Sequence, residues 1–390
     1  MASGLRARLN AIASASPRAP VQAPRAGGLL RREHRERADA RLFSLDADGL
    51  RRIGWCGRGF RIEDCLFLDT ETTGLSGGAG TVAFLVGLGY VEGDEFVVEQ
   101  LLMRDYGDEP ELIDCVARRM ARFGAVCSFN GKNFDLPLLK SRFVMCRRAD
   151  DWRELEQLDL LYPARRTWKM RIGSCRLSRL EEMILGAPRG EDLPGSEVPQ
   201  RYFDYLKSGD LSLLKDILEH NRRDIVTLGA LLSELCALYA APGRATQRAD
   251  IFSMGRALEN QGELRPAREL YRIAAAPPAA GSISSLSGDA LAGEAAWRLY
   301  LLCRKNRDAE GMREILEKMA LRRQKRDLIY VELSKLYEHR YKNPRRALRY
   351  ADLAANYAGP EQAQDIARRR ARLRGKIDRE AERKKDNGFF

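Results

Sequence analysis

The segment FLDTETTGL, residues 67–75, joins the end of an apolar run to two carboxylates. The run begins at Cys65 and has the composition of a buried strand. Side chains two residues apart point to the same face of a strand, so we expect Asp69 and Glu71 to lie together. Two carboxylates held this way repel each other unless a cation neutralises them, and oxygen ligands suit Mg²⁺ or Mn²⁺. Alone, an Asp-x-Glu pair is typical of a solvated strand end.

A second acidic motif follows another predicted strand. The strand over 126–129 leads through SFNGKNFD, residues 128–135, into a predicted helix. Asp135 is a helix N-cap, a site carboxylate or both, because this junction faces the same end of the sheet as Asp69. Lys132 is free to contact phosphate, although a loop lysine is commonly just solvated.

The third motif is HNRRD, residues 220–224, within a helical pattern. A spacing of four places His220 and Asp224 on one face, one turn apart. Alone, they form an ordinary surface pair of a helix. In a functional interpretation, Asp224 is a metal ligand and His220 a base whose unperturbed pKa lies near neutrality.

Together, the three motifs resemble those of the DEDD superfamily of exonucleases, whose first motif commonly reads DxETTGL. Similarity to the YprB-like group of ribonuclease H-like proteins extends over LFLDTETTGLSGGAGTVAFLVGLG, FNGKNFDLPLL, LDLLYPARRTWK and HNRRDI. Proteins of that group often carry tetratricopeptide repeats behind the nuclease domain. The resemblance covers about residues 65–239, and the helical region behind them more loosely.

The resemblance implies a two-metal phosphodiesterase. Asp69 would bridge two divalent cations, Mg²⁺ or Mn²⁺, about 3.5 to 4 Å apart. Glu71 and Asp224 would complete one cation site, Asp135 would support the other, and His220 would activate or orient the attacking water. The characterised branches place a histidine five residues, or a tyrosine four residues, before the last aspartate. This chain departs from both, because His220 stands at the tyrosine spacing.

The resemblance also implies how a nucleic-acid strand is held. Leu75, in the TTGL turn, would wedge against the terminal base, and a basic loop around Trp168 would contact phosphates. Trp168 itself stacks on a base or packs in the core, and the core is favoured because large aromatics are usually buried. The predicted substrate-binding residues are Thr72, Leu75, Asn130, Lys132, Arg165, Arg166 and Lys169.

The composition favours a polyanionic partner. The 390 residues carry a net charge of +12, and lysine and arginine gain by displacing counterions from phosphates. Nucleic acid is the leading partner, ahead of an anionic membrane surface. No apolar run approaches the roughly 20 residues that cross a bilayer, so no membrane span is expected. The eight cysteines include no CxxC pair, which argues against a zinc site or a disulfide framework and fits a cytoplasmic protein.

The length indicates two domains with tails. The hairpin predicted over 82–103 and the alternation behind it indicate an α/β fold with a mixed sheet flanked by helices. The resemblance implies that this fold is ribonuclease H-like. Behind it, small and large residues are spaced as in tetratricopeptide repeats, and a generic helical bundle is the alternative. The expected divisions are a basic, largely disordered arm over 1–50, the nuclease domain over 51–242, the all-α repeat domain over 243–366 and a charged tail over 367–390.

Other elements follow from local patterns. The stretch between Gly186 and Leu211 has the composition of a Gly- and Pro-rich connection, and 211–239 predicts one or two helices. Asp159 ends a predicted strand and is either a partner of the site or a structural cap.

Three functions are compatible with these motifs. The leading one is a 3′–5′ exonuclease acting on single-stranded DNA or RNA, with the repeats available to a protein partner. The others are a structure-selective endonuclease on the same scaffold and a non-catalytic nucleic-acid-binding adaptor. The complete carboxylate set favours an enzyme. Discrimination between DNA and RNA depends on contacts to the 2′ position, and no motif in this sequence indicates such contacts.

Overall fold

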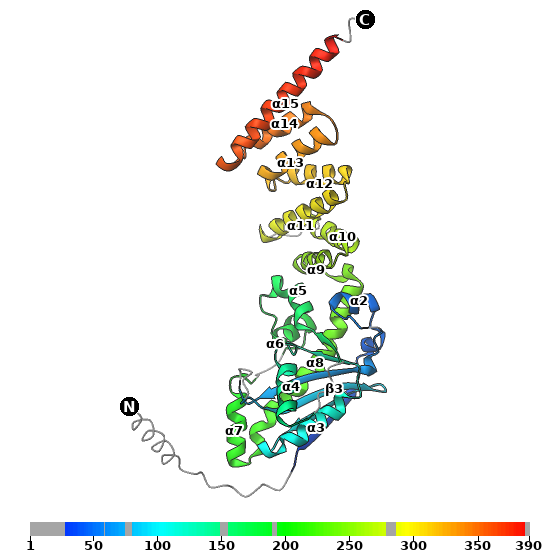
Figure 1. The fold of residues 1–390 in the computed structure, drawn as a ribbon, viewed down its shortest axis with the longest axis vertical. Coiled ribbons are helices and arrows are strands. Elements are labelled where there is room, and N and C mark those ends of the chain that lie inside the picture. Colours follow the sequence, from blue (N-terminus) through cyan, green and yellow to red (C-terminus); the bar gives the residue numbers. More distant parts are fainter. Residues whose placement is uncertain are drawn as a thin grey trace, which may run out of the picture.

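The computed structural model describes residues 28–57, 59–74, 80–148, 155–188, 193–277 and 286–386. Figure 1 shows an α/β part and a series of helices that extends away from it toward the C-terminus. The predicted fold class, a mixed sheet flanked by helices and followed by an all-α region, is confirmed.

The described sheet has six strands in the spatial order β1-β4-β3-β2-β5-β6. Strands β2, β5 and β6 run parallel, whereas β1, β4, β3 and β2 pair antiparallel. Parallel strands end at one edge, so the residues that follow β2, β5 and β6 gather there. The strands are β1 (Leu30–Arg37), β2 (Cys65–Thr72), β3 (Ala83–Glu92), β4 (Glu95–Leu102), β5 (Ala125–Ser128) and β6 (Glu156–Asp159).

Helices cover both faces of this sheet. The α-helices of the α/β part are α2 (Ala47–Ile53), α3 (Glu109–Met120), α4 (Asp135–Met145), α5 (Leu161–Ile172), α6 (Leu177–Leu180), α7 (Val198–Ser208) and α8 (Lys215–Ala240). Helix α6 continues into a π-helical turn, Glu181–Leu185. Short 3-10 helices occupy Ala40–Ser44, Ile62–Asp64, Tyr106–Asp108, Leu211–Leu214 and Pro242–Arg244.

Alternation along β2 decides which side chains face which helices. Phe67 packs in the hydrophobic cluster that contains α8. Leu66 and Leu68 pack in the cluster that contains α3, α4 and α7. Because side chains alternate with a period of two, Asp69 shares the α8 face with Phe67, and Thr70 points to the α4 side.

The predicted hairpin is confirmed by the pairing of β3 with β4 from Leu85↔Leu102 to Glu92↔Glu95. Its turn contains Gly93 with φ 65°, a left-handed conformation that glycine adopts without a Cβ clash.

The prediction of a disordered arm over 1–50 is wrong for residues 28–50, which form a strand and helices. Strand β1 pairs with β4 from Leu30↔Leu102 to Arg37↔Glu95, and Leu50 of α2 is buried against α8. The sequence of β1, LRREHRER, lacks the apolar alternation that marks a half-buried strand, and its backbone ladder holds it at the sheet edge. Residues 1–27 lie outside the described residues.

Two further segments are more helical than their patterns predict. The basic stretch expected as a loop is helix α5, in which Trp168 is 2% exposed, so the interpretation of Trp168 as a core residue is confirmed. Helix α7 occupies part of the expected connection and buries Tyr202 and Tyr205. In α7 the buried residues Val198, Tyr202 and Tyr205 are spaced as one helical face, and in α5 charged residues are interleaved with the buried ones, so packing on the core stabilises both helices.

The helical part consists of consecutive helices that each pack on the next. A Cβ on Gly255 would lie 2.9 Å from the ring of Tyr271, so a small residue faces a large one where the first two helices meet. Assignment of these pairs as tetratricopeptide repeats stays a prediction. The helices are α9 (Arg248–Asn260), α10 (Leu264–Ala275), α11 (Leu286–Lys305), α12 (Ala309–Leu321), α13 (Arg326–His339), α14 (Pro344–Ala355) and α15 (Pro360–Asp386).

Helix α15 includes most of the segment expected as a charged tail. Leu373 is fully buried among the residues of α13 and α14. The buried carboxylate of Glu338 pairs with Arg369, Arg372 and Lys376 at 2.9, 2.7 and 2.5 Å. The charge pattern that suggests a solvated tail therefore serves to anchor a helix.

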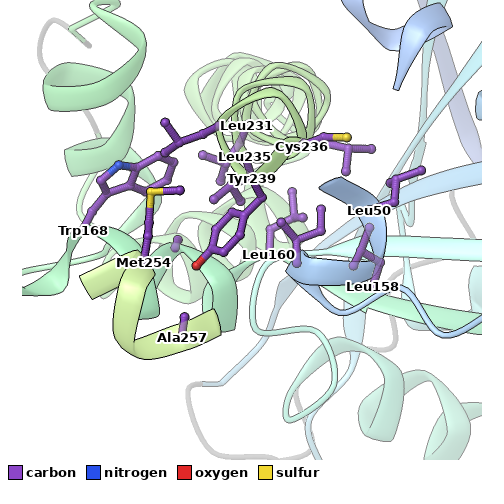
Figure 2. Close-up of a cluster of buried hydrophobic side chains, with 14 of the residues drawn as sticks. Leu50, Leu158, Leu160, Trp168, Leu231, Leu235, Cys236, Tyr239, Met254 and Ala257 are labelled. Carbon is purple, nitrogen blue, oxygen red and sulfur yellow. The ribbon is translucent and has the colours of Figure 1, made fainter. Parts of the chain in front are cut away.

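One hydrophobic cluster continues from the α/β part into the helical part. Figure 2 shows Trp168 of α5, Tyr239 of α8, and Met254 and Ala257 of α9 packed together. Beside them, Arg171 Nε donates to both carboxylate oxygens of Asp250 at 2.9 and 2.8 Å. Helix α9 is thus held against α5 by a shared core.

Among the described residues, no helix combines the length and the apolarity needed to cross a membrane. The eight cysteines are free thiols and six of them are buried, whereas Cys56 is exposed and Cys146 is half-buried.

Candidate active site

Asp69 and Glu71 lie at the carboxyl end of β2, a strand held between β3 and β5. The register between β2 and β3 shifts between Glu71 and Thr72. Such irregularities re-aim side chains at the edge of a sheet. The Glu71 side chain is 15% exposed. A central strand therefore presents both carboxylates at a partly open edge.

A buried amide from α8 orients Asp69. Asn221 is fully buried, and its Nδ2 donates to Asp69 Oδ2 at 2.8 Å. On the other side, Gln100 Nε2 of β4 donates to Asn221 Oδ1 at 2.9 Å. Because both ends of the Asn221 amide have partners, the amide is fixed in one orientation, and Asp69 is held with it.

Gly87 makes room for this amide. It pairs with Asp69 in β2 and with Gln100 in β4, so it stands between the two side chains that Asn221 joins. A Cβ on Gly87 would overlap the Asn221 side chain. Gly89, two residues along, leaves similar room for the next turn of α8. The two glycines let α8 lie close enough to the sheet for a hydrogen bond to Asp69.

Asp135 is the first residue of α4 and approaches the edge from the opposite face. Thr70 Oγ1 donates to Asp135 Oδ1 at 2.5 Å. Burial raises the pKa of Asp135 to about 6, and the hydrogen bond from Thr70 acts in the other direction. Asp135 therefore gains more from a nearby cation than an exposed aspartate would.

Asp224 and His220 reach the edge from α8. His220 Nε2 lies 3.5 Å from Asp224 Oδ2 and 3.9 Å from Glu71 Oε1. The Asp224 and His220 side chains are 13% and 19% exposed, so all three groups stay accessible. The imidazole therefore lies within reach of two carboxylates that come from different segments.

The four carboxylates are close enough to interact. Burial and then the charges of Asp224, Asp135 and Glu71 raise the pKa of Asp69 well above its ordinary value, whereas the Asn221 hydrogen bond lowers it. An oxygen-only set of this kind has the donor chemistry that hard divalent cations prefer.

These side chains do not form a preassembled cage. Within the described residues, no three His, Cys, Asp or Glu side chains are grouped closely enough to hold a metal ion. Like charges repel each other, and Asp69 and Asp135 are already held by neutral donors from Asn221 and Thr70. The donor set thus fits divalent cations chemically, and its side chains would have to move closer together to bind them.

Two clefts flank the carboxylates. One, of about 370 Å³, is lined by Glu71, Thr72, Phe134 and Asp135, and its floor is Thr70. The other, of about 600 Å³, opens beside His220 and is lined by acidic and basic side chains of α7 and α8. Solvent and a ligand can therefore reach Glu71 and Asp135 from the first cleft and His220 from the second.

Comparison with known proteins shows to which family this architecture belongs. Residues 66–236 match the RNase_H superfamily. The chain is also 31% identical over 301 residues to "Uncharacterized protein YprB" of Bacillus subtilis (strain 168), and this similarity covers 76% of the chain and 70% of the relative. The chain belongs to the YprB-like group of the RNase_H superfamily. Its ribonuclease H-like domain is of the nuclease type, a fold that generally uses divalent cations.

Among solved structures, this YprB-like chain is similar to the family B DNA polymerase from the hyperthermophilic archaeon Pyrobaculum calidifontis. The TM-score is 0.36 at 16% identity, and the match covers 53% of this chain and 30% of that chain.

The loop after β5 in this YprB-like domain is fixed by Asp159. The Asp159 carboxylate accepts from the backbone nitrogens of Asn130, Lys132 and Leu161 at 2.8, 3.2 and 3.0 Å. Asn130 has φ 67°, a left-handed conformation that asparagine tolerates better than most residues. Asp159 thus has the capping role, and it holds the exposed Lys132 beside the carboxylate edge.

The predicted basic residues lie apart from this edge. Arg165, Arg166 and Lys169 line a cleft between α5 and α9. Thr72 does lie beside the carboxylates, where its hydroxyl donates to Gly74 O at 2.7 Å. Leu75 lies outside the described residues.

The sequence motifs alone do not single out three residues of the YprB-like site, namely Asn221, Thr70 and Gln100. Asn221 carries a recognisable signal, because it occupies a buried position of α8 between Leu218 and Ile225 where an apolar side chain is expected. Gln100 carries a weaker one, as a polar residue that is 6% exposed within β4. Their mutual hydrogen bond follows only from the packing of α8 on the sheet.

Proposed function

We propose that this chain is a metal-dependent 3′–5′ exonuclease that hydrolyses the terminal phosphodiester of single-stranded DNA or RNA. The observation that carries the proposal is the gathering of four carboxylates from three separate segments at one sheet edge, where burial and then the neighbouring carboxylate charges raise the pKa of Asp69. Such a concentration of negative charge can bind divalent cations, which in turn bind a phosphate.

In this proposal, Asp69, Glu71 and Asp224 would hold one cation, and Asp135 would help to hold a second. When bound, the cations supply the positive charge that offsets both the carboxylates and the charge developing on the phosphate. Asn221 keeps Asp69 directed at this position, and Thr70 does the same for Asp135. His220, 3.5 Å from Asp224, accepts the proton of the attacking water.

The strand end is held by the surroundings of these carboxylates. The cleft of about 370 Å³ beside Glu71 and Asp135 receives the terminal nucleotide. Phe134 is 55% exposed there and offers an aromatic ring to a base. Lys132 and Asn130, on the loop fixed by Asp159, lie where they can contact the phosphate. An unpaired end suits this cleft, because a base must be free of its partner to lie against the Phe134 ring.

The deciding experiment is cleavage of end-labelled single-stranded DNA and RNA with Mn²⁺ or Mg²⁺, using the intact protein and Asp69→Asn. We expect a ladder that shortens from the 3′ end and is lost in the variant. Cutting of circular single strands would replace the exonuclease with an endonuclease. Binding without cleavage by either protein would assign the chain to non-catalytic nucleic-acid binding.

The role of His220 has a separate test. We expect His220→Ala to lower the cleavage rate by roughly 10²- to 10⁴-fold, the usual contribution of a positioned general base. The rate should be measured between about pH 6 and 9, the range that brackets the imidazole pKa. Full activity of the variant across this range would mean that another group takes the proton.

A further inference from the structure

A basic cleft lies where the α/β part meets the first helix of the helical part. It has a volume of about 470 Å³ and opens between α5 and α9. Arg165, Arg166 and Lys169 line it from α5, and Arg256 and Asn260 line it from α9. Figure 1 shows α5 next to α9 at this junction. The helical part therefore supplies one wall of a cleft whose other wall begins at the candidate active site.

The positive charge of this cleft is not neutralised within the described residues. Arg165, Lys169 and Arg256 are exposed and form no ion pair with a described carboxylate. The contrast with Arg171, on the same helix, is clear, because Arg171 is paired with Asp250. Unpaired cations that share one cleft repel each other, so a polyanion is the ligand that they favour.

The two walls of the cleft are packed against each other. Met170 of α5 and Ser253 of α9 line it and are in contact, with Ser253 Oγ 3.9 Å from Met170 Sδ. Beneath them, Trp168, Met254 and Ala257 belong to one buried cluster, as Figure 2 shows. The two helices that carry the arginines and the lysine are thus packed together before any ligand binds, which reduces the entropy lost on binding.

The cleft is connected to the carboxylate edge by one face of α5. At its start, Leu161 N donates to Asp159, and the Tyr162 hydroxyl accepts from Asn133 Nδ2 at 2.9 Å. Tyr162, Arg165 and Lys169 are spaced three and four residues apart and so follow one face of the helix. Tyr162 is 39% exposed. Cations interleaved with an exposed aromatic ring are typical of surfaces that track single-stranded nucleic acid.

We propose that a single strand, with its 3′ end at the carboxylates, runs along α5 and places its more distant phosphates in the cleft between α5 and α9. This proposal rests on the proposed function for the direction of the strand. Arg165 and Lys169 bind phosphates from one side and Arg256 from the other, while Tyr162 stacks on a base between the cleft and the cut end. The first helix of the helical part is therefore a nucleic-acid-binding element.

The test compares binding of short and long strands by the full chain. Fluorescent oligothymidylate and oligouridylate of about 4 and about 16 nucleotides span the range of single-strand site sizes. Anisotropy is measured in EDTA on the Asp69→Asn background, so that cleavage plays no part. Arg256→Gln is compared with Arg265→Gln, which removes the same charge from an exposed arginine of α10 that does not line the cleft.

We expect Arg256→Gln to weaken binding of the long strand by about 5- to 10-fold, with less than a 2-fold change for the short strand. The slope of log affinity against log salt should fall by about 0.7, the value for one lost phosphate contact to a single strand. Arg265→Gln should change neither quantity. Equal losses for both lengths, or equal effects of the two variants, would overturn the proposal. Melting temperatures check that both variants are folded.

Two outcomes separate this proposal from the proposed function. If the wild type cleaves strands but Arg256→Gln binds both lengths like its control, the proposed exonuclease activity is supported and the proposed path along α5 is rejected. If Arg256→Gln shows the length-dependent loss of binding but the wild type cuts nothing, the path is supported as a binding surface and the proposed exonuclease activity is rejected. Displacement of the long strand by polyglutamate at equal charge concentration would assign the cleft to an acidic protein instead.

Discussion

At the scale of single residues, the site depends on how neutral side chains hold charged ones. Asp69 is oriented by the amide of Asn221, which is itself fixed by Gln100, and Asp135 is held by the Thr70 hydroxyl. None of these donors carries a charge, so none cancels the negative potential that would attract cations. The sequence motifs identify the acids, whereas the donors become visible only from their contacts.

Replacement of Asn221 tests this arrangement. Asn221→Leu keeps the number and branching of the side-chain heavy atoms but removes the hydrogen bonds to Asp69 and Gln100, so Asp69 loses its orientation. We expect the cleavage rate to fall by about 10- to 100-fold, as when a partner of a metal ligand is lost. Gln100 Nε2 keeps its hydrogen bond to Leu218 O, but the loss of the buried hydrogen bonds to Asp69 and Gln100 should lower the free energy of unfolding by about 1–3 kcal/mol. Cleavage kinetics and urea unfolding check both values. An unchanged cleavage rate would contradict a positioning role.

Asp135 leads to a prediction about pH. Its pKa in the folded chain is about 6, raised from 3.8, so the neutral form is favoured by folding. The corresponding stability is present below about pH 4 and is lost as the pH rises through about 6. In EDTA, the melting temperature should therefore fall more between about pH 5 and 7 in the wild type than in Asp135→Asn.

Divalent cations should reverse this trend, because they bind the ionised carboxylate. Mn²⁺ is expected to raise the melting temperature of the wild type more at about pH 7.5 than at about pH 5. Thermal unfolding at the two pH values measures this difference. A melting temperature whose pH dependence is the same in wild type and Asp135→Asn would mean that the carboxyl of Asp135 does not titrate in this range.

At the scale of elements, the approach of α8 to the sheet decides whether the carboxylates meet. Gly87 and Gly89 remove two side chains from β3 at the points where α8 lies against it. Helix α5 shows another situation, because charged residues are interleaved with its apolar ones and its helical form depends on burying Trp168 against the core. Local propensity is therefore a weak guide where a neighbouring element supplies the packing.

Gly87→Ala tests the spacing between α8 and the sheet. The added methyl group would overlap the Asn221 amide, so α8 must shift and Asp69 must move with it. We expect a loss of roughly 1–3 kcal/mol in the free energy of unfolding, as for overpacked cores, and a reduced cleavage rate. Gly124→Ala is the control, because a Cβ there meets no atom within 4 Å. Equal behaviour of the two variants in unfolding and cleavage would contradict this view.

At the scale of the whole molecule, the α/β part and the helical part share a core. Leu231, Leu235 and Tyr239 of α8 lie in the same cluster as Met254 and Ala257 of α9. The ion pair between Arg171 and Asp250 lies beside this cluster. A junction built in this way carries the helical series in a fixed relation to the α/β part, as a continuous binding surface across it requires.

Arg171→Met tests the junction. It leaves the carboxylate of Asp250, which is 5% exposed, without its partner. Loss of one member of a buried ion pair costs roughly 3–5 kcal/mol, and the double variant with Asp250→Asn should recover part of this loss. Urea unfolding followed at several probes should change from one transition to two. A single transition at the wild-type midpoint would show that the ion pair does not hold α9 on α5.

The sequence by itself determined the fold class, the order of the acidic motifs and the candidate carboxylates Asp69, Glu71, Asp135 and Asp224, because these follow from alternation, spacing and chain order within short segments. The tertiary structure alone decided the contact of Asn221 with Asp69 and the pairing of the charged strand β1. It also decided the meeting of α5 with α9. Each of these brings together segments far apart in the chain, and their free energy comes from packing and burial that no local pattern records.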